Sequence, residues 1–167
     1  MIFVTVGSSL PFDRLIQTVD DVAGEGILGD QLFAQIGSGR YVPKSFACES
    51  YVDRERYAEL IETADAVVSH AGIGTISMAL RMRKPIAVMP RLRSRGELVD
   101  DHQRTTAARF QQMGHVMSFA NADELRRIAP SIKSFVPVPR RPDAAGIACE
   151  IGAFLREMLR RPLQQSR

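Results

Sequence analysis

Cysteine, tryptophan and long apolar runs are scarce or missing in this sequence. Its 167 residues contain two cysteines and no tryptophan. Cys48 and Cys149 lie far apart and in no metal-ligand spacing, which excludes a disulfide scaffold and favours free thiols in a reducing compartment. No segment approaches the ~20 consecutive apolar residues that a membrane-spanning helix needs. We therefore expect neither a small disulfide-rich domain nor a transmembrane protein.

A strong charge bias and a secretory leader are also missing. Lysine and arginine number 22 against 19 aspartates and glutamates, an excess too small to indicate a nucleic-acid partner. The opening MIFVTVGSSL has no basic segment, and its apolar run has the length of a strand. The sequence thus predicts a cytoplasmic protein, which could still dock on something membrane-bound.

Short apolar runs alternate with helical patterns along the whole chain, which predicts a doubly wound α/β domain with a parallel sheet covered on both faces. The single domain is expected to span 1–167, with its core within about 1–135. Strands are predicted at 2–6, 32–36, 45–52, 66–69, 86–89 and 116–119. Helices are predicted from Pro11 onward and at 54–63, 74–82, 100–113, 121–129 and 144–159. The last of these lies within the expected C-terminal helical region, 143–160.

The stretch SHAGIGTISMAL, residues 69–80, places a histidine between a strand and the first turn of a helix. A helix N-terminus presents unpaired N–H groups that suit a phosphate. Gly72 and Gly74 remove side chains where a diphosphate would approach, and Thr75 adds a hydroxyl. His70 would then point an N–H at the same oxygens. The alternative is a glycine turn required by sterics alone, with a half-exposed histidine bonded to a carbonyl.

Two more turns are expected at the same edge of the sheet, because the carboxyl ends of parallel strands lie together. The first, VGSSLP, carries Gly7, Ser8 and Ser9. The second, GELVDDHQ, carries His102 and Gln103, which could bond sugar hydroxyls. Each turn alone is also consistent with a solvated loop.

An arginine-rich segment, PRLRSRGE, lies between these motifs and contains Arg91, Arg93 and Arg95. It is either a solvated loop or a site for an anion, such as a uronate carboxylate on the donor or the diphosphate of an acceptor. Near the end of the chain, the apolar stripe of helix 144–159 favours packing on its own domain, with contact to a partner as the alternative.

Three of these stretches resemble one enzyme family. SHAGIGTI, KPIAVMP and DHQ are similar to the C-terminal, donor-binding half of family 28 glycosyltransferases. The opening MIFVTVGSSLPFDRLI resembles the small catalytic subunits of split glycosyltransferases, both the eukaryotic dolichol-linked N-acetylglucosaminyltransferase and the bacterial exopolysaccharide type that includes glucuronosyltransferase subunits. The resemblance extends from residue 1 to about residue 114.

The resemblance implies a single Rossmann-like sheet, equivalent to one half of a two-domain B-type glycosyltransferase. The donor would be a UDP-sugar and the acceptor a lipid-diphosphate-linked sugar in exopolysaccharide synthesis. A second, membrane-anchored subunit would supply the other half and hold the chain at the inner face of the membrane. The resemblance implies neither a metal nor another cofactor, and a homo-oligomer is left open.

By the same likeness, the turn with His70, Gly72, Gly74 and Thr75 would hold the UDP diphosphate. His102 and Gln103 would contact the donor sugar, and Gly7, Ser8 and Ser9 would face the cleft. Tyr51 and Val52 are weaker candidates for contacts to uracil. One position departs from the pattern: Met78 stands where several relatives have an acidic residue for the ribose, and a thioether accepts such hydrogen bonds poorly.

Sugar transfer also needs a general base, for which the sequence offers no clear candidate. His70 and His102 are the catalytic candidates, and His115 is expected to be structural because it starts a strand. We expect the base to come from the partner. The alternative function is a noncatalytic nucleotide-binding or scaffold subunit of a polysaccharide-synthesis complex. A Rossmann oxidoreductase is disfavoured, since G-x-G-x-x-G and an acidic end of the second strand are missing.

Overall fold

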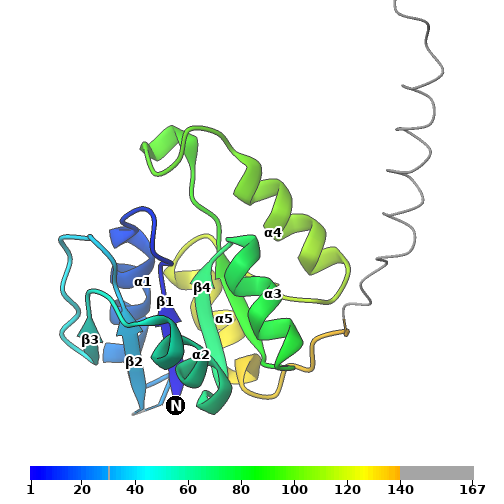
Figure 1. The fold of residues 1–167 in the computed structure, drawn as a ribbon, viewed down its shortest axis with the longest axis horizontal. Helices are drawn as coiled ribbons and strands as arrows, with labels where there is room; N and C mark the ends of the chain where they lie inside the picture. The colour runs from blue at the N-terminus through cyan, green and yellow to red at the C-terminus, as the bar shows by residue number, and fades with distance from the viewer. Residues whose placement is uncertain (30, 140–167) are drawn as a thin grey trace, which may run out of the picture.

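Six parallel strands form the centre of the molecule in the computed structural model, which describes residues 1–29 and 31–139 (Figure 1). The strands are β1 (Ile2–Thr5), β2 (Leu32–Gln35), β3 (Ala47–Glu49), β4 (Ala66–His70), β5 (Ile86–Met89) and β6 (Met117–Ser118). Their order in the sheet is β3-β2-β1-β4-β5-β6, and every neighbouring pair is parallel. The predicted doubly wound parallel sheet is confirmed.

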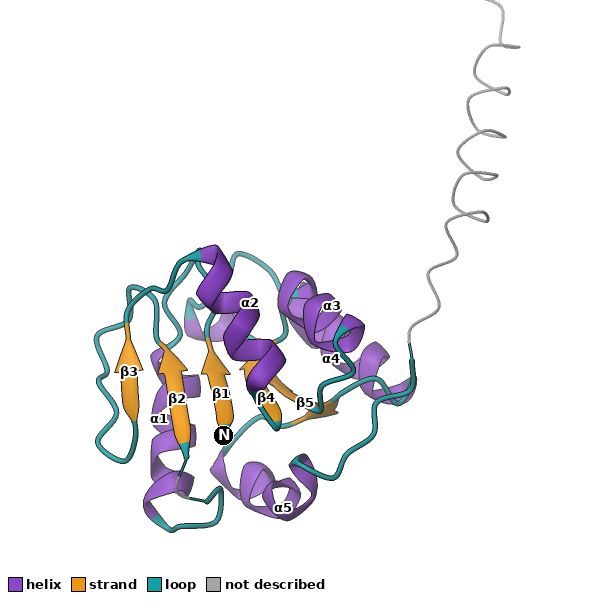
Figure 2. Cartoon of the chain, turned by 60° about the horizontal axis from the view of Figure 1, so that its bottom comes forward, coloured by secondary structure: helices purple, strands orange, loops and turns teal. Residues whose placement is uncertain are grey.

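Helices cover both faces of this sheet (Figure 2). One face carries α1 (Asp13–Gly24) and α5 (Ala122–Ile132). The other face carries α2 (Arg54–Thr63), α3 (Ile73–Arg81) and α4 (His102–Gln112). Side chains alternate along a strand, so Ile2 and Val4 of β1 enter the first core and Phe3 the second. A strand buried on both faces must be apolar throughout, as β1 is.

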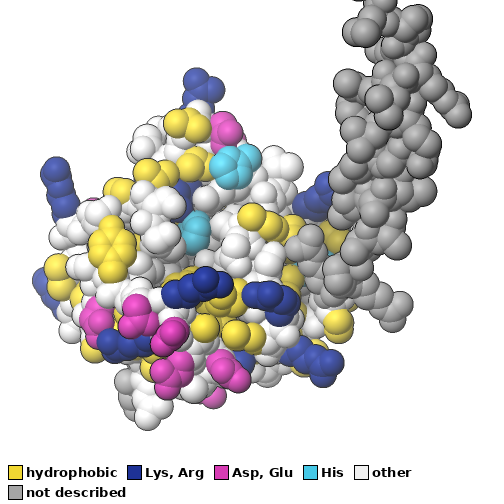
Figure 3. All heavy atoms as spheres, in the orientation of Figure 1, with side chains coloured by type: hydrophobic (Ala, Val, Ile, Leu, Met, Phe, Trp, Pro, Cys, Tyr) yellow, Lys and Arg dark blue, Asp and Glu magenta, His cyan; other side chains and the backbone are white. Residues whose placement is uncertain are grey.

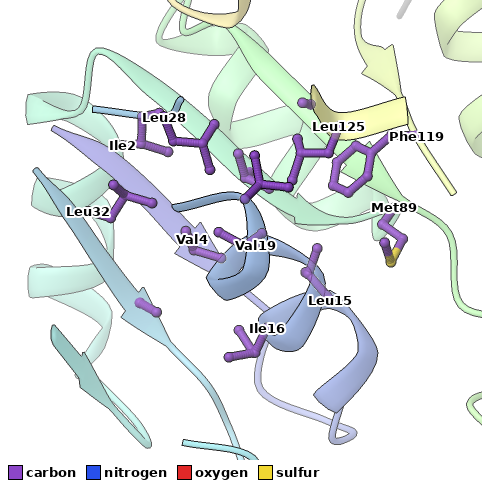
Figure 4. Packing of buried hydrophobic residues seen from close by; sticks show 14 of the residues in the cluster. Ile2, Val4, Leu15, Ile16, Val19, Leu28, Leu32, Met89, Phe119 and Leu125 are labelled. Atoms are coloured by element: carbon purple, nitrogen blue, oxygen red, sulfur yellow. The ribbon is translucent and has the colours of Figure 1, made fainter. Parts of the chain in front are cut away.

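The packing of α1 follows from its sequence. Leu15, Ile16 and Val19 recur at the spacing of one helical face, and all three are fully buried. They contact the core that Val4 and other strand residues line (Figure 4). Fully burying one such side chain stabilises the fold by about 1.5–3 kcal/mol.

The structure shifts several predicted boundaries. α1 begins at Asp13, because Phe12 takes the N-cap position and turns its ring into the core. α4 begins at His102 rather than at residue 100, and α5 continues past the predicted residue 129 with Pro130 inside its last turn. α5 continues because the apolar spacing does: Ile132 is fully buried. β3 and β6 are shorter than predicted.

The predicted helix 144–159 and Cys149 lie outside the described residues. Cys48 is a free thiol, half-buried, and burial raises its pKa. Within 1–29 and 31–139, no helix combines the length and the apolarity required to cross a membrane.

Asp20 of α1 holds the long connection between β2 and β3. Its carboxylate accepts hydrogen bonds from the Tyr41 hydroxyl (2.7 Å) and from the backbone N–H groups of Lys44 and Ser45 (3.0 and 2.8 Å). Burial alone would raise the pKa of Asp20, but these hydrogen bonds outweigh it and lower the pKa. The connection therefore depends on one buried carboxylate rather than on regular structure.

Asp20→Ala is expected to lower the free energy of unfolding by about 2–4 kcal/mol, because it leaves three donors without their acceptor. Urea unfolding measures this loss. Asp21→Ala is the matched control, since Asp21 is the exposed neighbour on the same helix. Equal effects of the two substitutions would show that the carboxylate does not hold the connection.

Candidate functional site

A pocket of about 520 Å³ opens at the carboxyl edge of the sheet, where β1 and β4 lie side by side. Successive connections leave these two strands in opposite directions, which is where open α/β sheets bind ligands. We call it the carboxyl-edge pocket. It is lined by Val6, Gly7, Ser8, Ser9, Gln35, Tyr51, Val52, Asp53, Arg54, Tyr57, His70, Gly74, Thr75, Met78 and Arg91.

The surroundings of this pocket differ from the rest of the same face. Charged side chains gather over α2, whereas the surface nearer the carboxyl ends of the strands carries few of them and shows histidine side chains (Figure 3). A volume of about 520 Å³ lies within the range of about 300–1,000 Å³ that is usual for small-molecule sites.

The N-terminus of α3 faces this pocket and has no side-chain cap. Gly72 is the N-cap residue, and the first intrahelical bond runs from the N–H of Ile76 to the Gly72 carbonyl. The preceding N–H groups, including those of Gly74 and Thr75, therefore have no acceptor within the helix. A side chain added at Gly74 would meet nothing within 4 Å, so the backbone there is open to a ligand. This arrangement suits an anion.

The His70 ring is enclosed between two glycines. A Cβ atom at Gly7 would lie 2.6 Å from Cε1 of the ring, and a Cβ at Gly72 would lie 2.1 Å from Nε2. Both distances are far below van der Waals contact, so the ring itself requires glycine on each side. Gly72 does not line the pocket, and its small size is explained by His70 rather than by a ligand. Only Gly74 leaves the open space that the sequence predicted for both.

Burial keeps the His70 ring neutral. It lowers the pKa of His70 to about 4, the nearby Arg91 charge acts in the same direction, and the Thr5 backbone opposes them weakly. Nδ1 is buried and has no hydrogen-bond partner that meets the usual geometry. A neutral imidazole has one N–H, so His70 donates a hydrogen bond to a ligand in the tautomer that carries the proton on Nε2, and it brings no positive charge.

This low pKa predicts a loss of stability in mild acid. The unfolded chain binds a proton on His70 below its ordinary pKa of 6.5, whereas the folded protein does so only near 4. The part of the folding stability that depends on a neutral His70 is fully present above pH 6.5 and is lost as the pH falls toward 4. The loss amounts to about 2 kcal/mol at pH 5.0. Urea unfolding at pH 7.5 and 5.0 checks this. His70→Asn should remove that part of the pH dependence; an unchanged pH dependence would contradict it.

Gln35 is a pocket residue that the sequence did not single out. Its side-chain oxygen accepts from the Thr5 hydroxyl at 2.6 Å, and its nitrogen donates to the carbonyls of Gly7 and Ser50 at 3.1 and 3.3 Å. It therefore connects the turn after β1 to the turn before α2. In the sequence, the feature that could have identified Gln35 is its position as a polar residue at the end of an otherwise apolar strand.

Several other residues singled out in the sequence lie at the pocket wall. Tyr51, Val52 and Met78 line it, as do Ser8 and Ser9. The Thr75 hydroxyl, also at the wall, lies 2.9 Å from the Tyr57 hydroxyl. The turn after β1 and the turn before α3 are thus brought together, as predicted.

The three arginines do not form one patch. Arg91 is only 3% exposed and lines the pocket, whereas Arg93 and Arg95 are exposed in a short 3-10 helix (Arg93–Arg95) and do not line it. The reason is that Arg91 lies two residues after the end of β5 and donates to backbone carbonyls of the turn after β1. A shared anion site made of all three side chains is therefore excluded.

The GELVDDHQ turn is likewise divided. Gln103 is buried, and its side-chain oxygen accepts from the Arg91 N–H at 3.1 Å. His102 is exposed, pairs through Nδ1 with Asp100, and does not line the carboxyl-edge pocket. It lines a second pocket of about 640 Å³, together with Ala71, Ile73, Thr105, Thr106, Arg109, Phe110, Met113 and His115.

His115 has a structural contact. It is buried, and its Nδ1 donates to the Val138 carbonyl at 2.7 Å.

No cluster of three or more histidine, cysteine or acidic side chains that could hold a metal occurs among the described residues. In the part of the chain that the structure describes, the titratable side chains of the carboxyl-edge pocket are those of Tyr51, Asp53, Arg54, Tyr57, His70 and Arg91.

Known proteins resemble this chain in sequence. The human UDP-N-acetylglucosamine transferase subunit ALG13 is 37% identical over 124 residues, which is 69% of this chain and 10% of the human protein. The Saccharomyces cerevisiae subunit of the same name is 40% identical over 57 residues, 34% of this chain and 26% of the yeast protein. This chain thus spans about a tenth of the length of the human relative.

Solved structures support the fold. An NMR structure of ALG13 has a TM-score of 0.61 at 22% identity, with 89% of this chain and 93% of that chain covered. The glycotransferase of kitacinnamycin has a TM-score of 0.59 at 21% identity, with 93% and 38% covered. The sequence also matches the model of the glycosyltransferase family 28 C-terminal domain over residues 1–136. Since this match covers most of the chain, the protein belongs to the glycosyltransferase family 28 C-terminal domain family.

Proposed function

We propose that this chain is the donor-binding half of a UDP-sugar-dependent glycosyltransferase. The observation that carries the proposal is the uncapped N-terminus of α3, open at Gly74, on the wall of the carboxyl-edge pocket. The family and the names of the relatives, UDP-N-acetylglucosamine transferase subunits, agree with this proposal. The diphosphate would lie against the N–H groups of Gly74 and Thr75, and the nucleoside would extend toward Tyr51 and Met78.

In this proposal the chain stabilises the departing UDP. Negative charge develops on the diphosphate as the bond to the sugar breaks, and fixed N–H donors are most effective where charge develops. The N–H groups of α3 and the single N–H of His70 can act in this way. Because His70 is neutral well above pH 4, its protonation state should not change between pH 6 and 8.

We further propose that the general base and the acceptor site come from a second polypeptide. The Asp53 carboxylate lines the pocket but caps α2, accepting from the Arg56 N–H at 2.8 Å. His70 has one ring nitrogen buried. The acceptor would be a lipid-diphosphate-linked sugar in exopolysaccharide synthesis, and the partner would hold the chain at the membrane. Full sugar transfer by the isolated chain would disprove this division of roles.

The transferred sugar is tested by calorimetric titration. UDP-N-acetylglucosamine is the first donor to try, because the relatives carry that name. UDP-glucuronate is the second, because Arg93 and Arg95 remain exposed after β5 and suit a carboxylate. UDP itself and UDP-glucose complete the series. Binding of UDP is expected, with ADP as the control; no UDP binding, or equal binding of ADP, would contradict a uridine site.

A noncatalytic nucleotide-binding or scaffold subunit is the second candidate, and Met78 is the observation that favours it. Met78 lines the pocket. By the family resemblance, it stands where several relatives would have an acidic residue for the ribose. The two candidates differ in one assay: mixed with its partner and a lipid-linked acceptor, the enzyme subunit transfers sugar and the scaffold does not.

Met78→Glu is expected to increase the affinity for UDP by about tenfold, since a hydrogen bond to a charged group contributes about 1.5–3 kcal/mol. Calorimetry with UDP and with 2′-deoxy-UDP measures the change. Met78→Gln is the uncharged control. The gain should be smaller for the deoxy nucleotide, and an equal gain for both would show that the introduced carboxylate does not contact the ribose 2′-hydroxyl.

A further inference from the structure

Arg91 is nearly fully buried and bonds to the turn after β1 at both ends of that turn. Its Nη2 donates to the Val6 carbonyl at 2.9 Å and to the Leu10 carbonyl at 2.7 Å. Residues 7–9, which line the carboxyl-edge pocket, lie between these two carbonyls. One guanidinium therefore fixes the two ends of a turn that has no regular structure.

A second set of contacts ties the segment after β5 to α1. Two guanidiniums contact the Phe12 ring, that of Arg91 at 4.9 Å and that of Arg14 at 5.1 Å from its centroid. Arg14 makes a bidentate pair with Glu97 at 2.7 and 2.8 Å and donates to the Pro90 carbonyl at 2.8 Å. Glu97 in turn accepts from the Leu92 N–H at 2.8 Å. We call Arg91, Phe12, Arg14 and Glu97 the clasp.

The buried Nε of Arg91, within the clasp, has no hydrogen-bond partner. Burying a guanidinium with an unpaired N–H is costly, and an apolar side chain would fill the same space without that cost. An apolar side chain could not donate the two hydrogen bonds to the Val6 and Leu10 carbonyls. The arrangement is therefore suited to holding the turn in one position.

We propose that Arg91 is the positioning residue of the carboxyl-edge pocket: through the Val6 and Leu10 carbonyls it holds the turn with Gly7, Ser8 and Ser9 against the α3 N-terminus. Arg93 and Arg95 have no part in this. The effect on ligand affinity rests on the proposed function, whereas the effect on the order of the turn does not.

Two measurements test the proposal on the full chain: backbone NMR order parameters of residues 8–10, and calorimetric titration with UDP. In the wild type the order parameters should be about 0.8 or higher. In Arg91→Met they should fall below about 0.6, with UDP binding at least tenfold weaker. Arg91→Lys, which keeps a cationic donor, should restore most of both. Arg93→Met should match the wild type in both measurements.

A stability effect is separated by Ile132→Ala, which removes a fully buried side chain of α5 outside the pocket lining and should leave residues 8–10 ordered. If Arg91→Met does not fold, Arg91→Gln replaces it; its shorter, neutral side chain keeps an amide donor, and an intermediate loss of order is expected. Order parameters at the wild-type level in the variant used would overturn the proposal, even if UDP binding were lost. A wild-type chain that bound no UDP, with an Arg91-dependent turn, would instead refute the proposed function alone.

Discussion

Gly72→Ala is expected to eliminate measurable UDP binding and to lower the free energy of unfolding by about 1–3 kcal/mol, as overpacking a filled site does. The added methyl group would lie 2.1 Å from Nε2 of His70. The ring also lies close to Gly7, where an added Cβ atom would lie 2.6 Å from Cε1, so it has little room to shift there. It must rotate away, and the donor at the α3 N-terminus is then displaced.

Gly74→Ala is the matched control for stability, because its methyl group meets no protein atom within 4 Å. It should leave the fold intact or stabilise it by up to about 1 kcal/mol, since glycine within a helix is unfavourable. It should still weaken UDP binding, because the methyl group occupies the ligand's approach to the backbone. Urea unfolding and calorimetry separate the two variants.

A double-mutant cycle completes this test. In the His70→Ala background, Gly72→Ala should cost almost no stability, because the ring that it would strike is gone. An equal cost of Gly72→Ala with and without His70 would show that the ring and the glycine do not interact as the structure shows.

His70→Ala is expected to lower sugar transfer by about 10²–10³-fold in the chain mixed with its partner and a lipid-linked acceptor, the loss typical of one removed donor at a site of developing charge. His70→Asn should lose less, because an amide can still donate one hydrogen bond. The pH dependence of the wild-type rate should not show a titration of His70 between pH 6 and 8, since its pKa is about 4.

The control for this variant is His115→Asn. His115 lies outside the carboxyl-edge pocket and donates a hydrogen bond to the Val138 carbonyl. It should retain transfer to the extent that it remains folded. If His70→Ala transferred sugar at the wild-type rate, His70 would have no part in the mechanism, and the diphosphate would be held by the backbone N–H groups of α3 instead.

The sequence predicted the sheet well because buried parallel strands are short apolar runs, and β1, β4 and β5 are of that kind. It also predicted that the turns at Gly7 and His70 would meet, which follows from parallel strands alone. Those inferences depend on the spacing of apolar residues, which can be seen within a few neighbouring positions of the sequence.

What the sequence did not show depends on side-chain direction. Arg91 and Arg93 are two residues apart in one polar segment, yet Arg91 is buried against the turn after β1 and Arg93 faces solvent. Gly72 and Gly74 look equivalent in the motif, but one accommodates an imidazole and the other leaves open space. Arg91 bonds to the turn after β1, and the His70 ring that fills the space at Gly72 also lies against Gly7 of that turn. The turn is distant in sequence, so no local pattern distinguishes these residues.

The most direct test of the account is a crystal structure of the chain with bound UDP. The diphosphate is expected within about 3 Å of the N–H groups of Gly74 and Thr75, at hydrogen-bond distance. The His70 ring should remain between Gly7 and Gly72. A nucleotide bound instead in the pocket of His102 and His115, or a carboxyl-edge pocket left empty at saturating UDP, would contradict it.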